Sequence, residues 1–185
     1  QTESKTIKFE SEESVIKRIE TRFNILHDMT KAVIAGDVRA MIVTGPPGVG
    51  KSFGVEKELD KSSMLDAIAG RSIKYEVVKG AMTALGLYAK LYEHADANHV
   101  IVFDDCDSVL MDELSLNILK AALDSGKKRV LHWNADSAKL RAEHIPNKFE
   151  FKGGVIFITN VKFENIRSKK LQDHLEALQS RCHYL

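Results

Sequence analysis

The chain has 185 residues, of which 44% are hydrophobic and 29% charged, and its formal net charge is +1 at pH 7. These values are typical of a globular protein that can bury a substantial core, and they exclude an intrinsically disordered chain. No apolar run approaches the ~18 residues of a membrane-spanning helix. A net charge near zero also excludes a strong overall attraction to nucleic acid, so local basic patches would have to supply any such binding.

The two cysteines, Cys106 and Cys182, are too few and too far apart in the sequence for a disulfide framework or a metal site. We expect reduced thiols in a cytoplasmic, intracellular protein with no membrane partner. The first ten residues lack the basic and then apolar pattern of a signal peptide. Because the chain begins at Gln1 rather than at methionine, we expect it to be an excised or processed piece of a longer protein.

Two predicted elements precede the most informative motif of the chain. Apolar residues recur at helical spacing over 11–34 and predict an amphipathic helix that packs on a sheet; they are Val15, Ile16, Ile19, Phe23, Leu26 and Met29. The apolar run 40–44 then predicts a strand. The motif follows this strand directly.

Residues 45–52 read Gly-Pro-Pro-Gly-Val-Gly-Lys-Ser and match in full the phosphate-binding loop G-x-x-x-x-G-K-[ST]. In such a loop the glycines turn backbone N–H groups toward phosphate oxygens, Lys51 reaches the β- and γ-phosphates, and Ser52 can ligate Mg²⁺. A helix that starts near Lys51 would point its positive end at the same phosphates. The alternative is a glycine turn that binds nothing. The predicted ATP-binding residues are Gly45, Pro46, Pro47, Gly48, Val49, Gly50, Lys51, Ser52 and Phe53.

The next patterns predict a helix over 53–69, a strand over 73–78 and a helix over 83–94. The strand predicted after them carries the acidic residues of the candidate site.

The apolar run 100–103 is typical of a parallel strand buried on both faces, and it ends in Asp104 and Asp105. A carboxylate at the carboxyl end of a core strand lies beside the phosphate loop. Asp104 is therefore the candidate that holds Mg²⁺ through its water shell, and Asp105 the candidate that polarises the attacking water. Alternatively, Asp105 caps the following helix, since the stretch from Asp105 to Ser108 is rich in cap-forming residues.

A helix over 113–123 is followed by strand-like segments at 129–133 and 148–152, which predict a hairpin inserted before the core strand 155–159. A last helix is predicted over 168–178. The alternation of strands and helices predicts an α/β fold with a doubly wound parallel sheet and right-handed crossovers. We expect one domain over 1–185, with 1–38 as a helical lead-in and 129–152 as the hairpin insertion.

Asn160 follows the core strand 155–159. Its amide can hydrogen-bond both an attacking water and a γ-phosphate oxygen, which makes it a third catalytic candidate. The alternative is a simple turn residue.

In order and approximate spacing, these motifs and the closing Gln179-Ser180-Arg181-Cys182 resemble the AAA+ ATPases, a family of P-loop NTPases. The tetrapeptide is similar to the Ser-Arg-Cys element of sliding-clamp loaders, whose arginine reaches the γ-phosphate of a neighbouring subunit. The resemblance implies a ring or helical oligomer in which Arg181 is the arginine finger, with Arg167 as second choice. The alternative for Arg181 is a surface arginine at a helix end.

The sequence departs from this family at two points. The acidic motif ends in Asp104-Asp105 where the family usually has Asp-Glu, and the shorter side chain implies slow hydrolysis. The family's helical lid, with its second sensor arginine, is expected to be absent because the chain ends three residues after Cys182.

Family members with a hairpin before the sensor strand include superfamily 3 helicases, branch-migration motors and protein unfoldases, which use it to touch a polymer in a central pore. Lys139 and Arg141, at the expected hairpin tip, are candidate contacts to DNA phosphates. The alternative is a solvated surface loop. We expect Trp133 to pack in the core rather than to stack on bases.

These observations predict a Mg²⁺-dependent domain that binds ATP and ADP and hydrolyses ATP. We expect it to act as an oligomeric motor or loader in DNA metabolism, of phage or plasmid type given its small size. A chaperone-like remodeller of protein complexes is one alternative. A nucleotide-dependent switch that binds ATP and barely turns it over is another.

Overall fold

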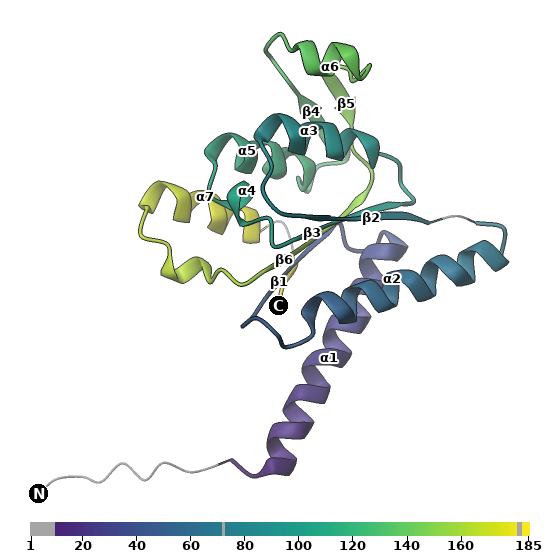
Figure 1. Ribbon diagram of the computed structural model, residues 1–185, viewed down its shortest axis with the longest axis vertical. Helices are drawn as coiled ribbons and strands as arrows, with labels where there is room; N and C mark the ends of the chain where they lie inside the picture. The colour runs from purple at the N-terminus through teal and green to yellow at the C-terminus, as the bar shows by residue number, and fades with distance from the viewer. Residues whose placement is uncertain (1–9, 72, 181–182) are drawn as a thin grey trace, which may run out of the picture.

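The computed structural model describes residues 10–71, 73–180 and 183–185. Within them the centre is a five-stranded sheet in the order β2-β3-β6-β1-β7, in which all neighbouring strands are parallel. The strands are β1 (Ala40–Thr44), β2 (Lys74–Lys79), β3 (His99–Asp104), β6 (Gly154–Thr159) and β7 (His183–Tyr184). Helices cover both faces of this sheet (Figure 1), which confirms the predicted α/β class with a parallel sheet.

One layer consists of α1 (Glu12–Ala35) and α2 (Lys51–Ile68), and the opposite layer consists of α3 (Ala84–Glu93), α5 (Glu113–Ala122) and α7 (Lys169–Gln179) (Figure 1). Shorter helical segments of the described chain are α4 (Asp107–Leu110), α6 (Ala138–Ala142) and the 3-10 helix η1 (Phe163–Asn165). Within the described residues, no helix is both long enough and apolar enough to cross a membrane.

Side chains of the central strands alternate between the two helical layers, because successive residues of a strand point to opposite faces. On β1, Ile42 packs with the α3, α5 and α7 layer, whereas Met41 and Val43 pack with α1 and α2. Phe103 of β3 and Phe157 of β6 stack with ring centroids 4.8 Å apart on the face that α3, α5 and α7 cover. Strands buried on both faces appear in the sequence as continuous apolar runs, which is why β1, β3 and β6 were predictable.

The predicted elements agree with the observed ones to within two residues at each end. The first helix starts where Ser11 accepts a hydrogen bond from the Ser14 N–H, and it ends at Gly36 in the left-handed conformation. Helix α2 begins at Lys51, two residues before the predicted start. The sequence reading missed α4, α6, η1 and β7.

The short strand β7 pairs with the outer edge of β1. Beyond it, Leu185 donates its N–H to the Ile42 carbonyl at 2.8 Å, and its carbonyl accepts from the Thr44 N–H at 2.8 Å. Thr44 Oγ1 also donates to this carbonyl at 3.1 Å. The last residue of β1 is therefore held by Leu185 at the point where the phosphate loop begins. Arg181 and Cys182 lie outside the described residues.

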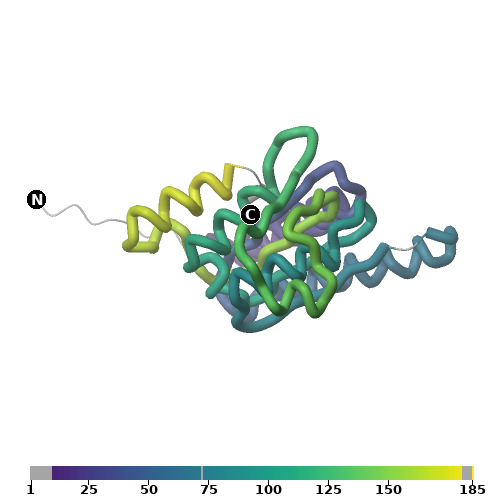
Figure 2. The backbone as a smooth tube through the Cα atoms, turned by 90° about the horizontal axis from the view of Figure 1, so that it is seen from above, coloured from purple at the N-terminus to yellow at the C-terminus, as the bar shows by residue number. Residues whose placement is uncertain are grey.

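The predicted hairpin is present, and it forms a small sheet of its own. Strands β4 (Val130–His132) and β5 (Lys148–Glu150) pair antiparallel, and α6 lies between them, where no helix was predicted. The hairpin stands over the layer of α3 and α5 in both views (Figures 1 and 2). The Trp133 and Tyr88 rings lie 5.7 Å apart, so Trp133 packs against the core as predicted.

The base of the hairpin is fixed by close main-chain packing and by a buried cation. The Arg129 guanidinium donates to the carbonyls of Ala122 and Gly153, both at 3.1 Å, and its carbon lies 5.1 Å from the Phe151 ring centroid. Burial lowers the pKa of Arg129 to about 10. Gly153 lies against the turn between α3 and β3, where an added Cβ would lie 2.3 Å from the His94 carbonyl oxygen.

Replacing Gly153 by alanine is expected to destabilise the fold by about 1–3 kcal/mol, the usual cost of overpacking. The added methyl group would meet backbone oxygens of His94 and His99, which cannot turn away as side chains do. Urea denaturation measures the difference. Gly126→Ala is the matched control, because its nearest neighbour is the movable Asp124 carboxylate at 3.1 Å. If both variants unfold at the parental urea concentration, the described packing of the hairpin base is wrong.

Candidate functional site

The phosphate loop joins the buried end of β1 to the start of α2. Gly48 (φ 78°) and Gly50 (φ 85°) adopt the left-handed conformation, which glycine reaches without steric cost. Gly50 is also the N-cap residue of α2 and offers no side chain to cap it. The N–H groups of the first turn of α2 are thus left without a side-chain acceptor at the position where a helix attracts anions.

The Lys51 ammonium bridges the phosphate loop and the end of β6. Its Nζ donates to the carbonyls of Gly45 at 2.7 Å and Pro46 at 2.8 Å, and to Asn160 Oδ1 at 2.9 Å. Burial lowers the pKa of Lys51, while the charge of Asp104 acts in the opposite direction. The three acceptors are neutral oxygens. Phosphate oxygens, which are charged, would bind the same ammonium more strongly.

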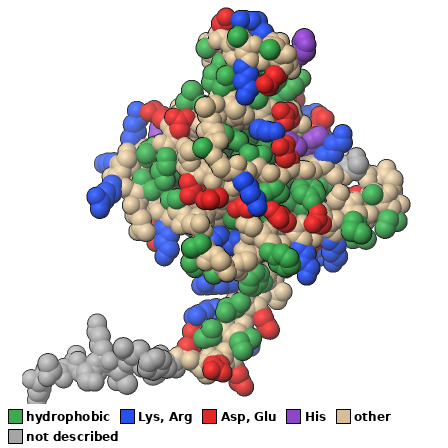
Figure 3. Space-filling view, viewed as in Figure 1, with side chains coloured by type: hydrophobic (Ala, Val, Ile, Leu, Met, Phe, Trp, Pro, Cys, Tyr) green, Lys and Arg blue, Asp and Glu red, His purple; other side chains and the backbone are tan. Residues whose placement is uncertain are grey.

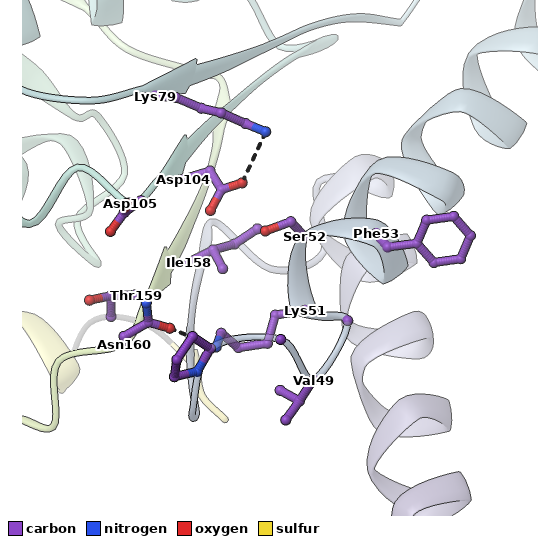
Figure 4. Close-up of a pocket in the computed structure, with 13 residues that line it drawn as sticks. Val49, Lys51, Ser52, Phe53, Lys79, Asp104, Asp105, Ile158, Thr159 and Asn160 are labelled. Atoms are coloured by element: carbon purple, nitrogen blue, oxygen red, sulfur yellow. Dashed lines mark hydrogen bonds and ion pairs between the residues drawn. The ribbon is translucent and has the colours of Figure 1, made fainter.

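Asp104 lies at the carboxyl end of β3 and is only 8% exposed. The Lys79 ammonium, at the end of β2, lies 3.6 Å from its carboxylate and 3.8 Å from that of Glu56. In Figure 4, Lys79 reaches toward Asp104, and Ser52 faces the same cleft from the start of α2. A hydroxyl and a carboxylate are oxygen donors of the kind that Mg²⁺ prefers, so Ser52 and Asp104 fit this ion.

Asp105 has a left-handed backbone with φ 58°. Its N–H donates to the Ile158 carbonyl at 3.0 Å, which ties the turn after β3 to β6. Its side chain is exposed and lines the cleft (Figure 4). The following helix, α4, has Cys106 as its N-cap residue and no capping hydrogen bond from a side chain. Capping of α4 by Asp105, the alternative considered from the sequence, is therefore not observed.

Cys106 is a buried thiol next to the acidic pair. Its Sγ donates to the Val78 carbonyl at 3.3 Å, and burial raises its pKa to about 11. The thiol is therefore protonated at neutral pH and plays a packing role.

The cleft bounded by the phosphate loop and the strand ends has a volume of about 580 Å³, within the usual range of small-molecule sites, ~300–1,000 Å³. It is lined by Pro47, Gly48, Val49, Gly50, Lys51, Ser52, Phe53, Lys79, Asp104, Asp105, Ile158, Thr159 and Asn160. The structure thus brings Asp104, Asp105 and Asn160 to the phosphate loop, as the sequence predicted.

The other predicted residues lie at the edge of the cleft or away from it. Gly45 and Pro46 act on the cleft through their carbonyls, which hold Lys51. Phe53 is 70% exposed at the rim. Arg167 is exposed between η1 and α7 and does not line the cleft. Lys139 and Arg141 belong to the distant hairpin. Arg181, the predicted finger, falls outside the described residues.

The sequence reading missed three residues that line the cleft, Lys79, Ile158 and Thr159. Lys79 ends β2 just as Asp104 ends β3, so the rule that selected polar residues at strand ends could have found it. Thr159 ends β6, and its Oγ1 donates to Asp107 Oδ1 at 2.6 Å. No sequence pattern signals this contact, because it depends on the turn at Asp105.

The chain is similar to a protein of Enterobacteria phage T4 described as an "Uncharacterized 36.7 kDa protein in nrdC-mobD intergenic region". The two are 39% identical over 178 residues, which is 95% of this chain and 53% of the phage protein. The chain therefore spans about half the length of the curated relative that it matches. No protein-family model matches the chain. The similarity agrees with the expected association with phage.

Proposed function

We propose that this chain binds ATP together with Mg²⁺ and hydrolyses it. The observation that carries the proposal is the meeting of a complete phosphate loop, Asp104, Asp105 and Asn160 in one cleft at the carboxyl ends of parallel strands. Ligands of open α/β sheets bind in this position. A glycine turn without a ligand would not require a buried carboxylate and a strand-end amide around it.

Binding is assigned to the loop and to the start of α2. The N–H groups of 45–52 receive the phosphate oxygens, and Lys51 exchanges its bonds to Gly45, Pro46 and Asn160 for bonds to the β- and γ-phosphates. Ser52 and Asp104 would hold Mg²⁺, which would neutralise charge on the transferred phosphoryl group. Lys79 shares the Asp104 carboxylate and keeps its negative charge balanced before the metal binds.

Hydrolysis is assigned to Asp105 and Asn160. The Asp105 carboxylate accepts a proton from the attacking water, and the Asn160 amide orients this water and one γ-phosphate oxygen. Asp105 is shorter than the glutamate usual in the AAA+ family. Its left-handed backbone supports aspartate at this position, because Asp and Asn adopt φ near 58° more readily than Glu.

The resemblance to AAA+ ATPases supports assembly into a ring or helical oligomer, with Arg181 acting on the γ-phosphate of a neighbour. In such an assembly the chain would be a motor or loader in DNA metabolism, and the similarity to a phage protein is compatible with this role. A chaperone-like remodeller would show fast ATP turnover that DNA does not stimulate. A slow switch would bind ATP with almost no turnover.

The hairpin is the candidate contact to DNA. With the two lysines that precede it, its segment 127–152 carries an exposed basic excess in a chain that is nearly neutral overall, with Lys127, Lys128, Lys139, Arg141, Lys148 and Lys152 against Asp136, Glu143 and Glu150. In Figure 3 basic, acidic and histidine side chains lie together on this projection. Arg141 forms an ion pair with Asp136, so it must exchange this partner for a phosphate when DNA binds.

Lys51→Ala should weaken ATP binding by roughly 10- to 100-fold, the effect of losing a charge-assisted hydrogen bond. Titration with a fluorescent ATP analogue measures the affinity. Lys61→Ala is the matched control, since this exposed lysine belongs to the same helix but not to the cleft. Parental affinity in the Lys51 variant would remove the basis of the assignment.

Asp105→Asn should keep Mg²⁺ and ATP affinity while slowing phosphate release by roughly 10²- to 10⁴-fold, the usual contribution of a general base. Asparagine tolerates the left-handed backbone and has nearly the same shape, so the turn after β3 is preserved. Binding and steady-state release are measured on the same preparation. Unchanged turnover would mean that another group activates the water.

Replacing both Lys139 and Arg141 by alanine should weaken binding of single-stranded DNA and reduce its salt slope by about 0.7 per lost phosphate contact. Fluorescence anisotropy at several salt concentrations gives this slope. The control is Lys31→Ala with Lys61→Ala, which removes the same charge from exposed positions of α1 and α2. Equal slopes in parent and hairpin variant would favour a solvated loop without a DNA contact.

A further inference from the structure

Thr159 is a buried polar residue whose hydroxyl joins two loops of the cleft. It ends β6 and is 2% exposed. Its Oγ1 donates to Asp107 Oδ1 at 2.6 Å and accepts from the Val161 N–H at 3.0 Å. The first bond crosses from the loop after β6 to the start of α4, which follows β3. The hydroxyl is thus used both as donor and as acceptor.

Each of these loops carries one catalytic candidate. Asp105 lies two residues before Asp107, and Asn160 directly follows Thr159. The Asp105 N–H is itself bonded to the Ile158 carbonyl at 3.0 Å. Two hydrogen bonds therefore tie the segment after β3 to β6, one at the Asp105 N–H and one at the Asp107 carboxylate. A left-handed backbone such as that of Asp105 persists only where the surroundings hold it.

We propose that Asp107 and Thr159 are a positioning pair that sets the separation between the Asp105 carboxylate and the Asn160 amide, so that both can hold one water. The inference rests on the proposed ATP hydrolysis. A water held by two groups is aligned for attack only when their spacing is fixed, and a misplacement of about 1 Å can cost roughly 100-fold in rate. Neither member of the pair needs to touch the nucleotide.

A purely local role for Asp107 would be to cap its own helix. Carboxylates in the first turn of a helix interact well with its N–H groups. In this chain, however, α4 is only four residues long, and no side chain caps its start. The Asp107 carboxylate instead accepts a hydrogen bond from Thr159 at the end of β6. The bond therefore serves the relation between two loops rather than the stability of one helix.

The test compares three substitutions in the full chain. Thr159→Val keeps the shape of the side chain and removes the hydroxyl, so kcat should fall roughly 10- to 100-fold while the dissociation constant of ATP stays within about twofold. Thr159→Ser restores the hydroxyl and should recover most of the turnover. The control is Thr30→Val, because Thr30 is equally buried but donates only to Leu26 of its own helix.

A second variant separates positioning from folding. Asp107→Ala should lower kcat as Thr159→Val does, and the double variant should be no slower than either single one, because both remove the same bond. Thermal unfolding identifies any variant that fails to fold, and Asp107→Asn, which keeps an acceptor oxygen for the Thr159 hydroxyl, should retain most of the turnover. Parental kcat in Thr159→Val, equal losses in the Val and Ser variants, or losses that multiply in the double variant would overturn the pair. Absence of ATP turnover in the parent would overturn the proposed function and the pair with it.

Discussion

The pairing of β6 with both β1 and β3 is the constraint on which the rest of the site depends. All residues of β6 are buried, and its backbone bonds to a parallel strand on each side. Because Thr44 is in register with Thr159 and Asp104 with Ile158, the three strands end at one edge. A slip of one residue would turn every β6 side chain to the opposite face of the sheet. The position of Asn160 relative to the phosphate loop is therefore set by the core.

Side-chain contacts also link the ends of these strands. Lys51 and Asn160 connect the loop after β1 to that after β6; Thr159 and Asp107 connect β6 to the segment after β3; Asp104 and Lys79 connect β3 to β2. The three contacts form a series across four neighbouring strands. A ligand that draws Lys51 away from Asn160 removes its first member. Because the strands themselves are fixed by the core, such a change acts on side chains and loops rather than on the sheet.

The sequence predicted those parts of the fold that depend on local patterns of residues. Continuous apolar runs gave β1, β3 and β6, and a polar residue after each run gave Asp104 and Asn160. No local pattern indicates the order of the strands, so the position of β6 between β1 and β3 could not be predicted from the sequence. Two-residue β7 has no apolar run, and α6 lies in a polar stretch without periodicity. The Thr159 contact depends on the left-handed turn at Asp105, and the sequence does not show which residue after β3 adopts this conformation.

The hairpin and the cleft lie at opposite ends of one buried strand. The hairpin base at Gly153 is followed by β6, whose six residues span about 20 Å and end beside Asn160. This strand is bonded on both edges and packed on both faces. At its amino end Arg129 donates to the Gly153 carbonyl, and the His94 carbonyl packs against Gly153. Strand β6 cannot slide independently of β1 and β3. A force on the hairpin therefore acts on the sheet as a whole rather than on β6 alone.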